Sequence, residues 1–333
     1  MNNIALVGYN NTLAKSLLEL MALRGQAKEN TAVFEANVLG EPKVSFGEED
    51  IIVRPLEKLD PAKYDAVIFA SREDTAARHG RKYAAAGTKV VNATAAFAGE
   101  EDVPVLVGGV NDDDLSKARN IISVPRPPVV QLLSAVAGLV SKYTISRIRL
   151  SAYVSADIEG QDGMSELYNQ TRRILMNDMA GADGGLFHKT LAFNVIPQAG
   201  AFIGEETACE WEYNTGVKQV LGAAVKVHAN CAVVPAFVGL GQFANIETIE
   251  EIDADEARDD IKKAKGVLVL DRQEDGGYVS LNDVQGESSV FVSRVRQDMT
   301  VENGISLWIA GDVYKIAAQN ILAVLKQFLK KGK

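Results

Sequence analysis

The first third of the chain alternates short, wholly apolar runs with amphipathic stretches of helical spacing. The apolar runs predict strands at Ile4–Val7, Ala32–Ala36, Ala66–Ala70, Lys89–Val91, Val105–Val107 and Ile121–Val124. The helical spacing predicts helices at Thr12–Leu23 and at Arg72–Ala86, the second ended by Gly87. Apolar strands that alternate with helices are typical of a parallel sheet covered on both faces. We therefore predict an α/β fold class with a doubly wound, Rossmann-type first domain.

The pattern changes after a predicted helix at Val129–Tyr143. Longer β-rich runs follow at Arg147–Ala156, Val225–Val234, Gly266–Leu270, Ser289–Val295 and Ser306–Ala310. Helical spacing is found at Gln161–Met176 and Glu205–Gly222, and an acidic, solvent-facing helix is predicted at Glu247–Lys265. Such an order is typical of an α+β domain with a mixed or antiparallel sheet.

The last helix, Tyr314–Lys330, carries apolar residues at helical spacing. We expect this helix to pack on the first domain. The predicted domains are therefore residues 1–126 together with 313–333, and residues 127–312.

Composition narrows the class of partner. The 333 residues carry a formal charge of −9 and are 47% hydrophobic, and the pI of about 5.1 argues against nucleic acid or an anionic membrane as partner. The first apolar run is too short for a signal peptide, and no run of 18 apolar residues exists, so we expect a cytoplasmic protein without a membrane partner. The two cysteines and three histidines are scattered without the spacing of a metal site.

Several segments together resemble the aspartate-semialdehyde dehydrogenase family. They occur in the family's order from end to end: VVNATAAFAGEEDVPVLVGGVN (Val90–Asn111), EGQDGMSELYNQT (Glu159–Thr171), LAFNVIPQ (Leu191–Gln198), VSRVRQD (Val292–Asp298) and SLWIAGDV (Ser306–Val313). The resemblance implies a dinucleotide-binding domain closed by the C-terminal helix, and an α+β dimerisation and substrate domain. It also implies a homodimer.

The same resemblance implies an activity whose residues are missing here. Family enzymes reductively dephosphorylate aspartyl phosphate with NADPH, using a cysteine nucleophile, a histidine acid/base, and an arginine and a glutamine that hold the substrate. The cysteine position is Pro127, the glutamine position Val154, the arginine position Val233 and the histidine position Leu240. The arginine that meets phosphate is replaced by Ala98.

The stretch IISVPRPPVVQ, which contains the position of the family's cysteine, is the strongest single indication that the family's catalysis is absent. Pro127 and Pro128 stand where a strand turns into a helix, the place for a nucleophile and for oxyanion-binding N–H groups. Proline supplies neither a nucleophile nor an N–H. The joint loss predicts a non-catalytic paralogue with a binding or regulatory role. Usg-type paralogues, which share the QLL helix start and lack the cysteine, are the form it resembles most.

The loop after the first strand is altered as well. Gly8 remains, but Asn11 and Ala14 stand at later family glycines, Asn37 at the basic residue that would read a 2′-phosphate, and Val313 at an asparagine near the nicotinamide. The residues that could still hold a cofactor are Gly8, Asn11, Thr12 and Leu13. The sequence thus predicts no bound cofactor, and NADP is the alternative that the resemblance leaves open.

Two enzyme hypotheses remain open. One is an NADP-dependent semialdehyde dehydrogenase-type oxidoreductase with a non-family nucleophile. However, Cys231 lies in a strand of buried character, and Cys209 lies beside Glu210, whose carboxylate disfavours a thiolate. The other is a different enzyme that uses the acidic Asp157–Asp162 loop, which we interpret as a solvated turn. Arg126 is likewise interpreted as an exposed turn residue.

Overall fold

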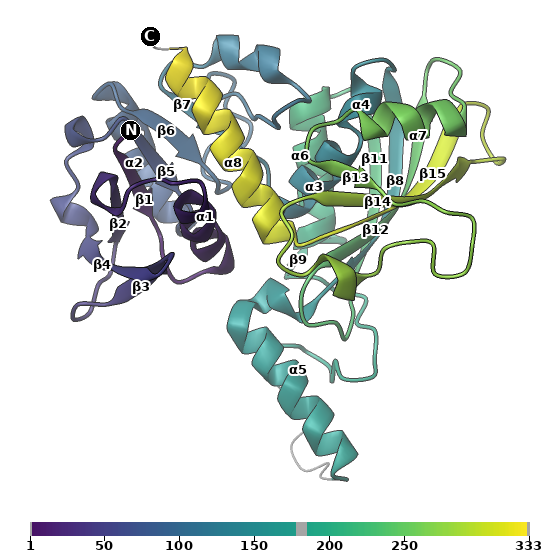
Figure 1. Cartoon of the computed structure of the whole chain (residues 1–333), viewed down its shortest axis with the longest axis horizontal. Coiled ribbons are helices and arrows are strands. Elements are labelled where there is room, and N and C mark those ends of the chain that lie inside the picture. Colours follow the sequence, from purple (N-terminus) through teal and green to yellow (C-terminus); the bar gives the residue numbers. More distant parts are fainter. Residues whose placement is uncertain (1, 178–184, 332–333) are drawn as a thin grey trace. The chain divides into compact units, whose positions relative to one another are not determined.

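The computed structural model describes residues 2–177 and 185–331 of the chain. The chain forms two compact units, Met1–Val130 with Tyr314–Lys333, and Gln131–Val313 (Figure 1). Residues 1, 332 and 333 of the first predicted domain, and 178–184 of the second, lie outside the described part. None of the helices in the described ranges is long and apolar enough to cross a membrane.

The first unit is built on a seven-stranded sheet. Its strand order is β3-β4-β2-β1-β5-β6-β7, with β1 (Ile4–Val7), β2 (Thr31–Glu35), β3 (Lys43–Phe46), β4 (Glu49–Pro55), β5 (Ala66–Phe69), β6 (Lys89–Asn92) and β7 (Ile121–Ser123). All neighbours are parallel except β3 and β4. The predicted doubly wound, Rossmann-type architecture is confirmed.

The observed sheet differs from the predicted one at two places near its edges. The antiparallel pair β3–β4 was not predicted, although buried residues alternate with exposed ones in both strands, as is typical of a half-buried strand. The predicted strand Val105–Val107 is wrong, since Val105 forms only an isolated bridge to Ser123.

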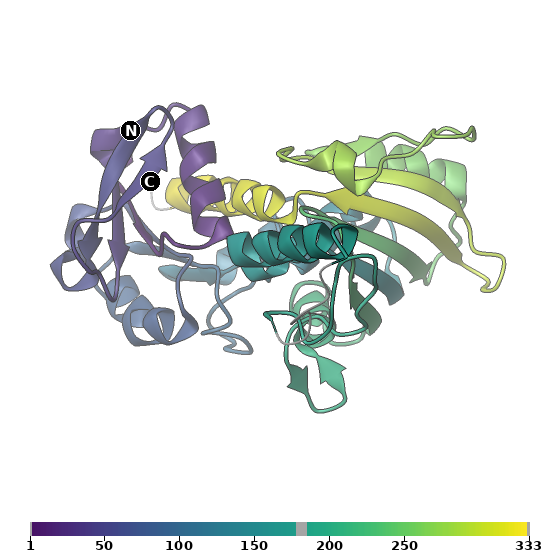
Figure 2. The same cartoon turned by 90° about the horizontal axis from the view of Figure 1, so that it is seen from below.

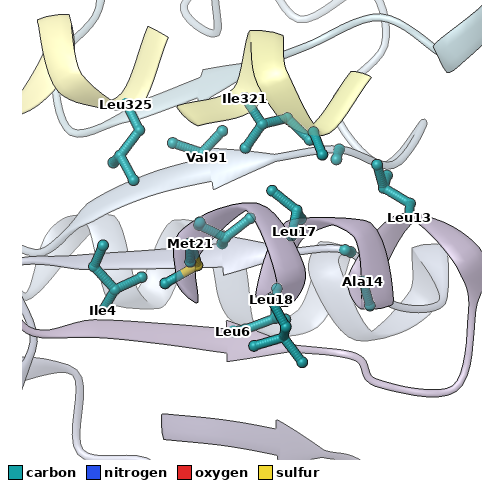
Figure 3. Packing of buried hydrophobic residues seen from close by; sticks show 14 of the residues in the cluster. Ile4, Leu6, Leu13, Ala14, Leu17, Leu18, Met21, Val91, Ile321 and Leu325 are labelled. Carbon is teal, nitrogen blue, oxygen red and sulfur yellow. The ribbon is translucent and has the colours of Figure 1, made fainter. Parts of the chain in front are cut away.

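Three helices cover this sheet: α1 (Thr12–Leu23), α2 (Glu73–Ala85) and α8 (Val313–Lys330). Leu17 of α1, Val91 of β6 and Ile321 of α8 meet in one hydrophobic cluster (Figure 3). Burying side chains of this size contributes about 1.5–3 kcal/mol each. The last helix therefore belongs to the core of the first unit, as its apolar spacing predicted.

The second unit is built on a six-stranded mixed sheet. Its order is β11-β8-β12-β15-β14-β13, with β8 (Ile145–Val154), β11 (Lys226–Val233), β12 (Leu240–Thr248), β13 (Val267–Val269), β14 (Val290–Gln297) and β15 (Gly304–Gly311). The pairs β11–β8 and β13–β14 are parallel and the others antiparallel; β14 and β15 form a long pair (Figure 2). The predicted α+β domain with a mixed sheet is confirmed.

The remaining elements connect or cover these sheets. The helices of the second unit and its boundary are α3 (Pro127–Ala135), α4 (Ala137–Val140), α5 (Gly160–Leu175), α6 (Ala208–Leu221) and α7 (Ala254–Lys262). A short hairpin, β9 (Phe202–Ile203) with β10 (Glu206–Thr207), precedes α6. Short 3₁₀-helices are η1 (Lys28–Asn30), η2 (Leu56–Lys58), η3 (Pro61–Lys63), η4 (Asp112–Lys117), η5 (Ala156–Glu159) and η6 (Leu281–Val284).

Two predictions for the second unit are wrong in instructive ways. The predicted helix Glu247–Lys265 is the end of β12 followed by the shorter α7, and β12 was missed because Gln242 interrupts its apolar face. The predicted helix Val129–Tyr143 is two helices, α3 and α4. In α4, Gly138 lies so close to α7 that an added Cβ would come within 2.0 Å of the Asp260 carbonyl oxygen.

Candidate functional site

The first candidate region is the carboxyl edge of the parallel sheet, where β1 has β2 on one side and β5 on the other. Dinucleotides bind at such a point in doubly wound folds, because the connections leave the central strand in opposite directions. Gly8 follows β1 directly and has a φ of +107°. Its N–H donates to the Phe34 carbonyl at 2.9 Å, and an added Cβ would come within 2.2 Å of the Ala70 oxygen. Only glycine fits this position.

Asn11, at a family glycine position, is the N-cap of α1. Its Oδ1 accepts from the Ala14 N–H at 2.9 Å, and its Nδ2 donates to the Ala70 carbonyl at 2.7 Å. The side chain is thus held between the first turn of the helix and the end of β5. An asparagine cap takes one of the donors that a phosphate could otherwise use at a helix N-terminus. Thr12 and Leu13 provide the other first-turn amides.

The second candidate region is an edge of the six-stranded sheet. Val154 at the end of β8 is in register with Val233 of β11 on one side and with Leu240 of β12 on the other. All three side chains are buried. The positions that the resemblance assigns to glutamine, arginine and histidine therefore form one contiguous row, and the row is apolar.

A buried polar chain lies next to this row. Gln131, fully buried in α3, donates from Nε2 to the Leu240 carbonyl at 2.9 Å and to Gln242 Oε1 at 3.3 Å. Gln242 Nε2 in turn donates to the hydroxyl of buried Tyr213. Within residues 2–177 and 185–331, Gln131 Oε1 has no hydrogen-bond partner. These hydrogen bonds connect α3 and α6 to β12.

Pro127, at the cysteine position, is buried and begins α3, while Arg126 before it is exposed as predicted. The N–H groups of Val129 and Val130 both bond back to the Arg126 carbonyl, at 3.0 and 3.1 Å. The helix therefore begins two residues earlier than predicted, since proline's fixed φ suits a first helical position. Its first two residues lack N–H groups, as expected for a turn unable to stabilise an oxyanion.

The prediction of a solvated acidic loop holds for Glu159 and Asp162, which are exposed, but is wrong for Asp157, which is only 3% exposed. The Ser155 hydroxyl donates to Asp157 Oδ1 at 2.6 Å, and Asp157 N–H donates to the Phe237 carbonyl. This carboxyl lies just beyond the apolar row, at the carboxyl end of β8.

Burial raises the pKa of Asp157 to about 6, although the hydrogen bond from Ser155 opposes the change; the negative charge of Asp312 raises it further. Asp312, also buried, follows β15 and accepts from the Gly286 N–H at 3.0 Å. Two buried carboxyls therefore influence each other at this edge. No sequence signal distinguished Asp157 from its exposed neighbours.

Both cysteines are buried. A hydrogen bond with Cys209 and then burial raise the pKa of Cys231 far above its ordinary value. The Cys231 N–H donates to Glu210 Oε1 at 3.0 Å, which joins the first turn of α6 to β11. A buried thiol with a raised pKa is a poor nucleophile, as the sequence interpretation of Cys231 expects.

The structure groups the predicted residues into two sets. Gly8, Asn11, Thr12 and Leu13 share the β1–α1 loop of the first unit, whereas Val154, Val233 and Leu240 share one row of the second. Pro127 lies at the start of α3, where the chain passes from one unit to the other. Sequence reasoning missed Glu35, the last residue of β2, although an acidic residue closing the second strand of a Rossmann fold is a known signal.

Comparisons with known proteins agree with this architecture. Residues 3–118 match the family described as semialdehyde dehydrogenase, NAD binding domain, and residues 136–313 match semialdehyde dehydrogenase, dimerisation domain. Aspartate-semialdehyde dehydrogenase of Rickettsia bellii is 30% identical over 98% of both chains, and that of Aquifex aeolicus is 28% identical over 99% of this chain and 98% of its own. The crystal structure of aspartate semialdehyde dehydrogenase II from Vibrio cholerae superposes with a TM-score of 0.91 at 25% identity, covering 99% of each chain.

Proposed function

Because the chain belongs to the aspartate-semialdehyde dehydrogenase family, we propose that it is a non-catalytic paralogue of the Usg type, with a binding or regulatory role. The observation that carries this proposal is the apolar row formed by Val233, Val154 and Leu240. A single altered position could be compensated by a neighbour. Three adjacent positions that are all buried and apolar themselves supply no side chain that could hold an anionic substrate or move a proton.

The start of α3 supports the same proposal independently. Pro127 offers no nucleophile, and the first two helical residues offer no N–H to a tetrahedral oxyanion. Removing a nucleophile and base that act as a unit typically costs on the order of 10⁶-fold in rate. Activity on the family substrate should therefore be indistinguishable from the uncatalysed background.

A steady-state assay tests this proposal. The purified chain is given aspartate semialdehyde and phosphate with NADP⁺ and, separately, with NAD⁺, and the Rickettsia bellii relative is assayed in parallel as the positive control. We expect no reduced cofactor above the protein-free blank. Ordinary turnover by the wild type would reject the proposal.

An alternative is an NADP-dependent oxidoreductase that uses another nucleophile. Cys209 and Cys231 are the only thiols in the chain, so this alternative predicts that Cys209→Ser or Cys231→Ser abolishes any turnover observed. The high pKa of Cys231 and the burial of both thiols argue against it. If both variants retain whatever rate the parent shows, this alternative fails.

We also propose that two copies associate through the outer face of the six-stranded sheet. On that face Tyr153, Phe243 and Trp308 are half-exposed and cluster, with the Phe243 and Trp308 rings 4.8 Å apart. The match to a dimerisation domain over residues 136–313 supports self-association of this unit. Aromatic side chains of this kind are enriched in protein interfaces.

Sedimentation analysis tests the association. Phe243→Glu should shift a dimer towards monomer, whereas Leu39→Glu, at a highly exposed apolar residue of the first unit, should leave it unchanged. A wild type that sediments as a monomer would remove the proposal.

The predicted functional domains, residues 1–126 with 313–333 and residues 127–312, become part of the same proposal. The first domain would bind a dinucleotide at the carboxyl edge of its sheet, and the second domain would form the contact between two copies of the chain. Gly8 and the first turn of α1 would hold the pyrophosphate of a dinucleotide. The nicotinamide of such a dinucleotide would supply hydride transfer. Asn11 caps α1 and occupies the Ala14 N–H, so the close approach of Gly8 and the remaining first-turn amides are what support this binding edge.

A further inference from the structure

Glu35 lies beside the glycine loop of the first unit. The parallel register pairs Val7 of β1 with Phe34 of β2, so Gly8 and Glu35 are the next positions on neighbouring strands. The Gly8 N–H reaches the Phe34 carbonyl at 2.9 Å, which fixes this alignment. The carboxylate of Glu35 is therefore placed at the carboxyl edge of the sheet, one strand away from the pyrophosphate loop.

This position has a defined chemistry in dinucleotide-binding folds. The adenosine ribose lies over the end of the second strand, where a carboxylate accepts a hydrogen bond from the ribose 2′-hydroxyl. A 2′-phosphate at the same place needs an arginine or lysine instead. A carboxylate both repels the phosphate and cannot donate to it.

The loop that follows β2 contains no cation that could offset this repulsion. The segment from Ala36 to Pro42 reads ANVLGEP, without lysine or arginine, and Glu41 adds a second carboxylate. The first basic residue along the chain is Lys43, in β3. The end of β2 and the loop after it therefore carry negative charge from Glu35 and Glu41 and no positive charge.

The carboxylate is also held at the strand end. Glu35 is half-buried, and its Oε1 accepts from the Ala36 N–H at 2.8 Å. This contact limits the rotamers open to the side chain, and a carboxylate accepts through its second oxygen as well. A group held in this way can bind a ribose hydroxyl with less loss of side-chain entropy.

We propose that Glu35 makes the first unit selective for a dinucleotide with an unsubstituted ribose 2′-hydroxyl, NAD(H), over its 2′-phosphorylated counterpart NADP(H). This selectivity goes beyond the proposed function and does not depend on whether the chain catalyses a reaction. It departs from the NADP that the family resemblance implies.

Isothermal titration of the full chain with NAD⁺ and with NADP⁺ at one fixed, low ionic strength tests the inference. The wild type should bind NAD⁺ at least about tenfold more tightly than NADP⁺. Glu35→Gln should reduce that ratio by about tenfold or more, chiefly by strengthening NADP⁺ binding. Glu41→Gln removes the same charge from an exposed position of the same loop and should leave the ratio within about twofold of the wild type.

A second variant tests the same selectivity in case Glu35→Gln does not fold. Asn37 is exposed, so Asn37→Arg adds a cation near the ribose edge without removing the Glu35–Ala36 contact. It should strengthen NADP⁺ binding and leave NAD⁺ binding nearly unchanged. Thermal unfolding without ligand checks that each variant is folded.

Three results would overturn the inference. They are NADP⁺ binding as tight as NAD⁺ binding in the wild type, no saturable binding of either dinucleotide, and an equal change in the ratio with Glu41→Gln and Glu35→Gln. None of these results bears on the missing catalytic groups. Equally, turnover of aspartate semialdehyde would reject the proposed function without touching the selectivity at Glu35.

Discussion

The two sheet edges differ in what they have kept. At the β1 edge the backbone features of a dinucleotide site remain: Gly8 at the close approach, and a helix that begins directly after the loop. At the edge formed by β11, β8 and β12, the positions to which the resemblance assigns polar substrate and acid/base residues hold Val233, Val154 and Leu240, which form one buried apolar row.

The difference shows which features the fold itself maintains. Gly8 is needed to let β1 approach the end of β5, whether or not anything binds there. By contrast, an arginine or histidine at a buried edge costs stability unless a ligand or partner compensates it. Where nothing compensates a buried charge, apolar residues are the more stable choice at such positions. Gly8 is therefore explained by the fold without a cofactor, whereas the apolar row is the feature on which the proposed absence of catalysis depends.

The largest effect should come from restoring a family charge to the apolar row. Val233→Arg places a cation at a buried position among apolar side chains, and we expect it to lower the free energy of unfolding by about 4 kcal/mol. Chemical denaturation measures the change. The matched control is Asn230→Arg, exposed on the same strand, with an expected change within about 0.5 kcal/mol. Equal effects of the two variants would show that the row tolerates charge.

Gly8→Ala should be next in size. The new Cβ would lie 2.2 Å from the Ala70 oxygen, at a φ of +107°, so we expect a loss of about 3 kcal/mol in unfolding free energy. Gly40→Ala is the control, because Gly40 has a φ of +70° but no neighbouring atom within 4 Å of its added Cβ. It should cost about 1 kcal/mol through backbone strain alone. A Gly8 effect no larger than that of Gly40 would remove the structural explanation for its retention.

Asp157 predicts a pH dependence. Its folded-state pKa of about 6 lies above the 3.8 of an unperturbed carboxyl. The stabilisation from binding this proton is therefore fully present below pH 3.8 and is lost as the pH rises through 6. Asp157→Asn should remove this pH-dependent decline in the free energy of unfolding and be about 2 kcal/mol more stable than the wild type at pH 8. Denaturant unfolding at pH 5 and at pH 8 measures the difference.

Asp162, an exposed carboxylate near Asp157, provides the control for the pH-dependent unfolding experiment. Asp162→Asn, in the same acidic segment, should show the wild-type pH dependence. A wild-type stability that does not decline between pH 5 and pH 8 relative to Asp157→Asn would contradict the raised pKa.

The smallest effect concerns the cap of α1. Asn11→Ala removes the bonds to Ala14 N–H and to the Ala70 carbonyl and should cost about 1 kcal/mol. Asn11→Gly, which restores the family residue, should cost only a few tenths of a kcal/mol. Thermal unfolding of the two variants distinguishes them. If alanine and glycine behave alike, the cap does not account for asparagine at this position.

Sequence patterns predicted elements well where one physical signal dominates. The strand Ile4–Val7 and the helix Thr12–Leu23 have the predicted bounds, because a wholly apolar run and an amphipathic stretch enclose a glycine and a capping asparagine. The strand β12 was missed because Gln242 is buried within it, satisfied by Gln131 and Tyr213 from distant elements. Such tertiary hydrogen bonds leave no trace in local periodicity.

The candidate site likewise has features that the sequence predicted and features that depend on the tertiary structure. That Val154, Val233 and Leu240 replace polar family residues could be inferred from the resemblance, but their shared register depends on strand pairing. The burial of Asp157 likewise depends on the chain segment around Phe237 and Gly239 and on nearby Asp312. Three carboxylates close together along the chain gave no means of separating the buried one from the exposed ones.

Single-turnover kinetics test the central claim most directly. The chain, at a concentration comparable to that of the dinucleotide, is mixed with aspartate semialdehyde, phosphate and either NAD⁺ or NADP⁺, and formation of reduced cofactor is followed from the first moments by nicotinamide absorbance. The loss of nucleophile and base predicts neither a burst nor a steady rate above the protein-free mixture. A burst of one equivalent per chain that disappears in Cys209→Ser or Cys231→Ser would contradict it.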